Sequence, residues 1–205
     1  MRMICFAATL LLLANFSLAQ DTPAANSKEK DKYVTLFDGK TLKGWKVIGC
    51  EAEVQDGAIF IKAGNGVVRP DRKYKDFVFE LDWKALKADN WDSGIYFRCE
   101  DPIKGDPWPW PKKYQANLKK DLEGNVDELK GASSTGLTKP GEWNHLKLTV
   151  IGTKAELELN GKPAWKADGV ETPTGYISLQ AEVPGGGQYL FRNIRVLEIN
   201  PADQD

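Results

Sequence analysis

From residue 33 onward, apolar and polar residues alternate with a period of two along much of the chain. The stretch 77–84 shows this most clearly, because four apolar residues share one face of an extended strand: Phe77, Phe79, Leu81 and Trp83. The stretches 145–151 and 155–159 repeat the pattern. Successive side chains of a strand point to opposite sides of a sheet, so the alternation predicts strands with one buried face.

The pattern and its turn signals predict a chain built from strands alone. We expect strands at 33–37, 51–54, 58–62, 77–84, 93–99, 113–118, 145–151, 155–159, 175–181 and 190–199. Asp-Gly or Asn-Gly dipeptides at 38, 56, 65 and 160 indicate turns, and Asn160-Gly161 is the strongest hairpin signal. Only 117–130 has a helix-like pattern, which Gly124 interrupts. This predicts an all-β, antiparallel sandwich or barrel of one domain over 33–199.

The first nineteen residues have the pattern of a signal peptide. Arg2 precedes an apolar run over 4–13, and small residues at 17 and 19 match a signal-peptidase site. The run is too short to span a membrane, and Cys5 lies at its start rather than after its end as in a lipoprotein. We therefore predict a signal peptide at 1–19, a flexible leader at 20–32 and a C-terminal tail at 200–205. The mature chain is expected to be periplasmic or secreted with no transmembrane anchor; an uncleaved N-terminal anchor is the alternative.

Composition and charge exclude several classes of protein. The 205 residues carry 28 Lys or Arg against 29 Asp or Glu, a net charge of -1 that argues against a nucleic-acid partner. A mean hydropathy of -0.45 excludes a polytopic membrane protein. Seven Trp, eight Phe and six Tyr exclude a disordered chain. The remaining class is a globular β protein with aromatic residues available for binding.

Few residues are available for metal chemistry. His145 is the only histidine, and Cys50 and Cys99 are the only cysteines after the signal peptide. In an oxidising compartment the two cysteines could form a disulfide, or they could remain separate buried thiols. A closed site of thiolates and imidazoles needs more ligands than these. The sequence thus requires no cofactor and leaves oxygen-bound calcium as the metal it could hold.

Five segments carry recognisable motifs. They are YVTLFDGKTLKGWKV at 33–47, DSGIYFRCE at 92–100, KYQANL at 113–118, PGEWNHLKLTVIGTKAELELNGKPAW at 140–165 and GYISLQAEVPGGGQYLFRNIRVLEI at 175–199. In this order they resemble the motifs of the 3-keto-disaccharide hydrolase domain family. The resemblance implies a concanavalin A-like jelly roll of two antiparallel sheets with a carbohydrate site on the concave face. It also implies action on 3-keto-glycosides, by hydrolysis or by 1,2-elimination followed by hydration.

Such chemistry needs a defined set of groups. A ketone at C3 acidifies the C2 proton, so a general base can remove it and the C1 substituent can leave. The enolate oxygen needs a cationic or hydrogen-bonding partner. Polar side chains would bind the hydroxyl groups and an aromatic face would pack on the ring.

Strand alternation selects the candidates for these roles. It places Tyr96, Arg98 and Glu100 on one face, opposite Ile95, Phe97 and Cys99. We expect Glu182 or Glu100 to be the catalytic base and Arg98 to bind the keto or enolate oxygen, although Arg98 could instead form a surface salt bridge. The residues expected to bind substrate, from the predicted strands 93–99, 113–118 and 175–181, are Tyr96, Lys113, Gln115, Asn117 and Gln180. Solvated polar faces are the alternative for these positions.

Three tryptophans complete the prediction. Trp108 and Trp110 alternate with prolines in the loop 106–111, and rigidly presented indoles would stack on sugar rings. The alternative is that one or both fold back onto the sandwich. Trp45 is either a core residue or a wall of the site.

One position departs from the family pattern. Many relatives of this family have a carboxylate where this chain has Lys113. Therefore a non-catalytic carbohydrate-binding module remains an alternative to an enzyme, and an adhesion or scaffold domain is a third reading.

Overall fold

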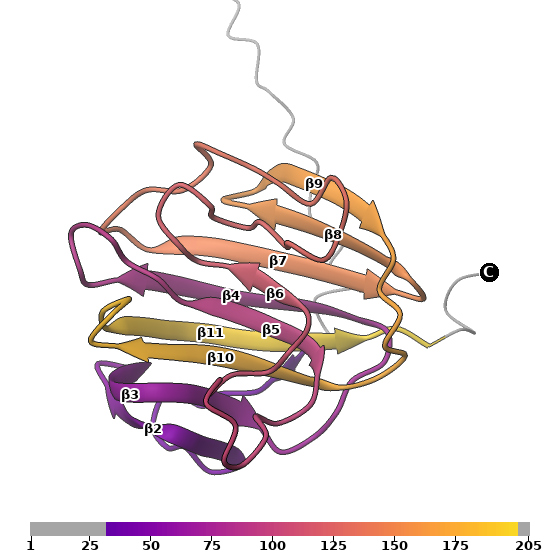
Figure 1. The fold of residues 1–205 in the computed structure, drawn as a ribbon. Coiled ribbons are helices and arrows are strands. Elements are labelled where there is room, and N and C mark those ends of the chain that lie inside the picture. The colour runs from indigo at the N-terminus through magenta and orange to yellow at the C-terminus, as the bar shows by residue number, and fades with distance from the viewer. Residues whose placement is uncertain (1–31, 201–205) are drawn as a thin grey trace, which may run out of the picture. The chain divides into compact units, whose positions relative to one another are not determined.

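Eleven antiparallel strands and no helix make up residues 32–200, the part of the chain that the computed structural model describes (Figure 1). The strands are β1 (Val34–Thr35), β2 (Trp45–Gln55), β3 (Ala58–Pro70), β4 (Phe77–Ala85), β5 (Gly94–Cys99), β6 (Gln115–Asn117), β7 (Asn144–Ile151), β8 (Lys154–Leu159), β9 (Lys162–Asp168), β10 (Tyr176–Val183) and β11 (Tyr189–Glu198). The main path of hydrogen-bonded neighbours is β6-β5-β10-β3-β11-β4-β7-β8-β9. The prediction of an all-β antiparallel fold is confirmed.

The sheet curls so that β5 and β6 pass in front of β4 and β7 in Figure 1. Strand β1 pairs with β11 and β2 pairs with β3, so all eleven strands belong to one hydrogen-bonded sheet. The division into two separate sheets of a jelly roll stays a prediction.

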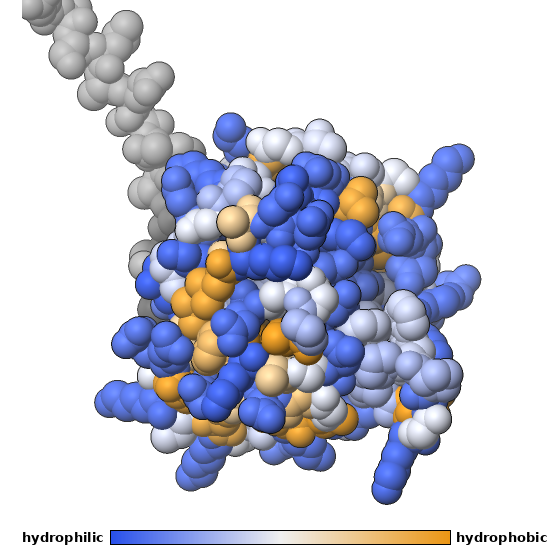
Figure 2. Space-filling model, turned by 60° about the vertical axis from the view of Figure 1, so that its left-hand side comes forward, coloured by the Kyte–Doolittle hydropathy of each residue, from blue (hydrophilic) through white to orange (hydrophobic). Residues whose placement is uncertain are grey.

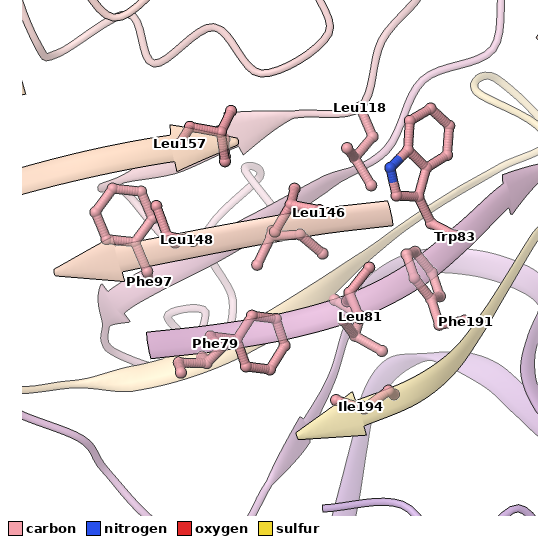
Figure 3. Close-up of a cluster of buried hydrophobic side chains, with 14 of the residues drawn as sticks. Phe79, Leu81, Trp83, Phe97, Leu118, Leu146, Leu148, Leu157, Phe191 and Ile194 are labelled. Atoms are coloured by element: carbon pink, nitrogen blue, oxygen red, sulfur yellow. The ribbon is translucent and has the colours of Figure 1, made fainter. Parts of the chain in front are cut away.

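The core lies between the two facing parts of the curled sheet. Phe79, Leu81 and Trp83 of β4 are at most 1% exposed, as the alternation predicts. Figure 3 shows them in one cluster with Phe97 of β5 and Leu118, which follows β6. On the face that Figure 2 shows, hydrophobic residues form only small separate patches among hydrophilic ones. Burial of this apolar surface is the main stabilising contribution to the fold.

Most predicted strands are present with shifted ends, and one predicted turn is wrong. The Asn160-Gly161 hairpin is confirmed, because both residues have positive φ (51° and 73°) between β8 and β9. The expected turn at Asn65-Gly66 lies instead inside β3. A Cβ on Gly66 would come within 1.9 Å of the Ile48 carbonyl oxygen, so this glycine permits close approach of β2. The helix-like stretch 117–130 forms turns after the end of β6.

The two cysteines described by the structure are free thiols. The Cys50 Sγ atom donates to the carbonyl oxygen of Val67 at 3.7 Å, and the Cys99 Sγ atom donates to that of Tyr176 at 3.5 Å. Burial raises the pKa of Cys50 to about 11 and that of Cys99 to about 12. Both side chains therefore remain protonated and unreactive at neutral pH.

The predicted signal peptide, the leader up to residue 31 and the tail from residue 201 lie outside the described residues. Within residues 32–200, no helix has the length and apolar character needed to cross a bilayer.

Candidate functional site

A cavity of about 540 Å³ lies over β5, β6 and β10, on the face opposite the main core. This volume is typical of small-molecule sites. Seven of the predicted site residues line it: Tyr96, Trp108, Trp110, Gln115, Asn117, Gln180 and Glu182. The cavity therefore brings together residues from three strands and one loop that are distant in sequence.

A row of amides crosses the floor of the cavity. The Gln115 Nε2 atom donates to Gln180 Oε1 at 2.5 Å, and Gln180 Nε2 donates to Glu182 Oε2 at 3.1 Å. Gly94 makes this row possible, because a Cβ at Gly94 would lie 2.2 Å from Gln115 Nε2. The row connects β6 to β10 and holds one oxygen of the Glu182 carboxylate.

Two glutamates of the cavity have raised pKa values. Burial raises the pKa of Glu182, and the negative charge of Asp92 raises it further. Burial also raises the pKa of Glu128, with a smaller contribution from Asp127. Both glutamates therefore hold a proton more readily than a solvated glutamate would, as expected of groups that exchange protons with a substrate.

The backbone fixes Asp92 beside Glu182. The Asp92 N–H donates to the Gly186 carbonyl oxygen at 2.9 Å, and the Gly186 N–H donates to that of Glu182 at 2.7 Å. A Cβ on Gly186 would meet the Asp92 carbonyl oxygen at 2.0 Å, so only glycine allows this contact. The Asp92 carboxylate also pairs with Lys119 Nζ at 2.8 Å. Gly186 of the glycine-rich stretch 185–187 is thus packed against the segment that carries Asp92.

The aromatic residues of the cavity differ in exposure. Trp110 folds back, since its Nε1–H donates to the Ala181 carbonyl oxygen at 2.8 Å. Trp108 is 50% exposed and meets Trp110 edge to face, with 5.1 Å between ring centroids. Tyr96 is buried, which raises the pKa of its phenol and keeps it protonated. The cavity therefore offers one exposed indole face and one neutral hydroxyl donor.

Arg98 does not share the face of Tyr96, and this part of the prediction is wrong. Its backbone has a φ of 45° and the pairing of β5 with β10 shifts register opposite it, so the alternation is broken at a bulge. The guanidinium is buried, pairs with Asp76 at 2.9 Å and donates to three carbonyl oxygens, those of Lys75, Gly152 and Thr172. Cys99 takes the face of Tyr96 instead, in a small cluster with Val67.

Three other predicted site residues lie outside the cavity. Glu100 is exposed and pairs with Lys73 at 2.5 Å. Lys113 is also exposed and lies 3.6 Å from a Glu171 oxygen. Trp45 is a core residue whose Nε1–H donates to the Leu36 carbonyl oxygen at 2.8 Å, so the site-wall alternative is wrong.

His145 lies away from this cavity, and no metal site is visible in the described residues. His145 lines a separate hollow of about 500 Å³, where its Nδ1 atom lies 2.9 Å from Asp82 Oδ1. Within residues 32–200, no group of three or more His, Cys, Asp or Glu side chains gathers in a way that could hold a metal ion. Calcium binding stays a prediction.

Sequence reasoning missed five charged residues that line the cavity: Asp92, Lys112, Lys119, Asp127 and Glu128. All lie outside the regular strands, where alternation gives no signal. Asp92 opens the DSGIYFRCE motif, and this position was the one available clue.

A family model matches most of the chain. The model of the 3-keto-alpha-glucoside-1,2-lyase-like domain family matches residues 32–197. A 3-keto-disaccharide hydrolase of Bacteroides thetaiotaomicron is 30% identical over 92 residues, which are 38% of this chain and 31% of that protein. The match therefore spans about a third of that relative's length.

Solved structures share the fold at low identity. A proposed glycosyl hydrolase from Parabacteroides distasonis has a TM-score of 0.64 at 21% identity, covering 86% of this chain and 99% of that one. A carbohydrate-binding module from Bacillus subtilis has a TM-score of 0.59 at 16% identity, covering 76% of this chain and 96% of that one. At these identities the likeness concerns the fold alone.

Proposed function

Because the chain belongs to the 3-keto-alpha-glucoside-1,2-lyase-like domain family, we propose that it is an enzyme that cleaves 3-keto-glycosides in the cavity over β5, β6 and β10. The observation that carries this proposal is the Glu182 carboxylate. It is half-buried, it is held at the end of the amide row, and its pKa is raised by burial and by Asp92. A carboxylate in this setting is suited to general-base catalysis near neutral pH.

The first step is removal of the C2 proton. Glu182 takes the proton, and the electron pair of the C2–H bond forms an enolate with its charge on the C3 oxygen. The Tyr96 hydroxyl and the amide N–H groups of the cavity are the donors available to that oxygen. A neutral phenol suits this role, because it donates a hydrogen bond without needing a counter-ion.

The second step expels the C1 substituent. The enolate collapses to the C3 ketone, a C1=C2 double bond forms, and the bond from C1 to the leaving oxygen breaks. A proton must reach that oxygen, and we assign its delivery to Glu128, whose raised pKa favours the acid form. Water then adds hydroxide to C1 and a proton to C2, so the overall reaction is hydrolysis.

The departure at Lys113 does not remove the chemistry from this cavity. Lys113 lies outside it, whereas four carboxylates line it: Asp92, Asp127, Glu128 and Glu182. The base is therefore supplied by β10 rather than by the segment before β6.

A non-catalytic carbohydrate-binding module is the second candidate function. The exposed Trp108 beside Trp110 favours it, because an exposed indole recognises a sugar ring without any chemistry. The deciding experiment incubates the chain from residue 20 with 4-nitrophenyl 3-keto-glucoside and follows nitrophenol release. Release supports the enzyme, whereas binding without release supports the module.

The proposal extends to the sheet architecture and the location of the protein. The curled sheet would be a jelly roll of the concanavalin A type with the cavity on its concave face. The mature protein would be periplasmic or secreted after cleavage at residue 19, without a transmembrane anchor. Mass measurement of the exported protein tests the cleavage.

Replacing Trp108 by alanine is expected to weaken sugar binding about tenfold, because the exposed indole face would be lost. Titration calorimetry with methyl 3-keto-glucoside, in a Glu182→Gln background that prevents turnover, measures the effect. Leu86→Ala is the control, since Leu86 is also exposed but lies outside the cavity. If the Trp108→Ala and Leu86→Ala variants bind the sugar equally well, Trp108 does not contribute to sugar binding.

Replacing Asp92 by asparagine is expected to move the acid limb of the kcat/KM profile to lower pH. The base must be ionised to act, and the Asp92 charge raises the pKa of Glu182, so its removal lowers that pKa. Asp89→Asn is the matched control, because Asp89 is exposed and pairs with Lys120 outside the cavity. If the acid limb does not move in the Asp92 variant, Glu182 is not the group whose ionisation produces that limb.

A further inference from the structure

A second hollow, of about 310 Å³, adjoins the proposed sugar cavity. Trp110 and Lys112 line both spaces. Ile103, from the loop between β5 and β6, lines the hollow but not the cavity. Because Trp110 and Lys112 belong to both walls, the hollow and the cavity are direct neighbours.

The charged side chains around this hollow already have partners. Arg98 is buried against Asp76 at 2.9 Å, and the carboxylate of Asp101 is held by the buried Arg69 through two hydrogen bonds of 2.5 and 2.7 Å. The remaining ion pairs lie at the rim: Glu100 with Lys73 at 2.5 Å, Lys112 with Asp106 at 2.9 Å and Lys113 with Glu171 at 3.6 Å. Each charged side chain that lines the hollow is therefore paired with another side chain of the protein.

The groups that remain are mainly apolar. Ile103 is 60% exposed, although isoleucine is usually buried. The Trp110 indole packs against the cluster of Tyr96 and Cys99, with its N–H turned to Ala181. The Cys99 thiol is occupied by the Tyr176 carbonyl oxygen and lies 3.4 Å from the Ser178 hydroxyl. An apolar group placed here would remove the exposed Ile103 surface from water.

The sugar cavity has the opposite character. Its amide row and its carboxylates match the hydroxyl groups of a sugar ring. A second sugar in the hollow would place hydroxyl groups against Ile103 and the Trp110 ring, which cannot replace the lost hydration, and this is unfavourable. The two spaces therefore suit the two ends of an amphiphilic glycoside.

Resting on the function proposed above, we propose that the hollow receives the leaving group of the substrate and selects an uncharged, apolar aglycone, such as a cycloalkyl or aryl group, over a second sugar. The substrates of this chain would then be 3-keto-glycosides of apolar alcohols or phenols. Ile103 and Trp110 would determine this selectivity.

The test compares three ligands with the same 3-keto-glucose unit and anomeric configuration: the methyl glycoside, the cyclohexyl glycoside and a 3-keto-disaccharide. Titration calorimetry uses the Glu182→Gln variant, so the result does not depend on turnover. The cyclohexyl glycoside is expected to bind about tenfold more tightly than the methyl glycoside, the effect of burying roughly two methylene groups. The disaccharide is expected to bind no more tightly than the methyl glycoside.

Adding Ile103→Ser is expected to lower the cyclohexyl-to-methyl affinity ratio about fivefold. Leu86→Ser is the matched control and should leave the ratio unchanged, because Leu86 is exposed but lines neither space. A ratio near one, a disaccharide that binds as tightly as the cyclohexyl glycoside, or an unchanged ratio in the Ile103 variant would overturn the proposal.

Failure of the proposed function gives a different result. If the wild-type chain releases no alcohol but the affinity ratio holds, the enzyme proposal fails while the hollow still selects apolar substituents of a bound sugar. If neither glycoside binds, both proposals are overturned.

Discussion

Replacing Glu182 by glutamine is expected to slow aglycone release from a 3-keto-glucoside by about a hundredfold to ten-thousandfold, the usual contribution of a general base. The amide has nearly the same shape and can still accept a hydrogen bond from Gln180, so the amide row is preserved. It cannot take the C2 proton. The loss is therefore expected in kcat, with substrate affinity close to that of the wild type.

Steady-state kinetics and calorimetry together measure this split. Glu53→Gln is the matched control, because Glu53 lies on exposed β2 and pairs with Lys62. Full activity in the Glu182 variant would contradict the assignment. Loss of activity in Glu100→Gln instead would identify Glu100 as the catalytic base. The chemistry would then take place at the hollow that Glu100 lines.

Replacing Arg98 by alanine is expected to lower the free energy of unfolding by about 3–5 kcal/mol, because it leaves the Asp76 carboxylate buried without its cation. The Arg98 guanidinium is 1% exposed, and Asp76 is 10% exposed. The same substitution also leaves the carbonyl oxygens of Gly152 and Thr172 without this donor. Urea unfolding measures the change.

The controls for Arg98 separate stability from catalysis. Arg72→Ala removes an exposed ion pair with Glu198 and is expected to cost at most about 1 kcal/mol. Arg98→Lys keeps the charge but not the fork of donors, so it should be intermediate in stability. If Arg98→Lys kept full stability but lost kcat, Arg98 would act on the substrate, contrary to its place in the structure.

The strand alternation could predict the part of the site that lies on β10. Ser178, Gln180 and Glu182 point away from the core because Ile177, Leu179 and Ala181 point into it. No insertion interrupts the period of two between these positions. The alternation of faces breaks where the backbone departs from a regular strand.

Arg98 shows such a departure. A positive φ is unusual for arginine, and nothing in its residue type signals a bulge. One irregular residue moves every later side chain to the other face, so Arg98 and Cys99 exchange the faces that the sequence predicts. At the bulge the guanidinium is buried against Asp76, a contact between residues 22 positions apart.

Asp92 and Lys119 could not be predicted for a different reason. Both come from irregular segments, and their meeting depends on the fit of Gly186 against the Asp92 backbone. The sequence shows Gly185-Gly186-Gly187 only as a glycine-rich loop, because composition does not reveal what a glycine touches. Three-dimensional contact, rather than periodicity, assembles this part of the site.

The amide row has a direction, and that direction has a stereochemical consequence. Each amide donates toward Glu182, and the row ends on Oε2, so Oε1 is the carboxylate oxygen that lies outside the row. Two sugars that are epimers at C2 present their C2 hydrogens to opposite faces of the ring. A carboxylate that the row holds in one orientation would reach one of those faces, so the row that orients Glu182 would also distinguish a gluco from a manno configuration.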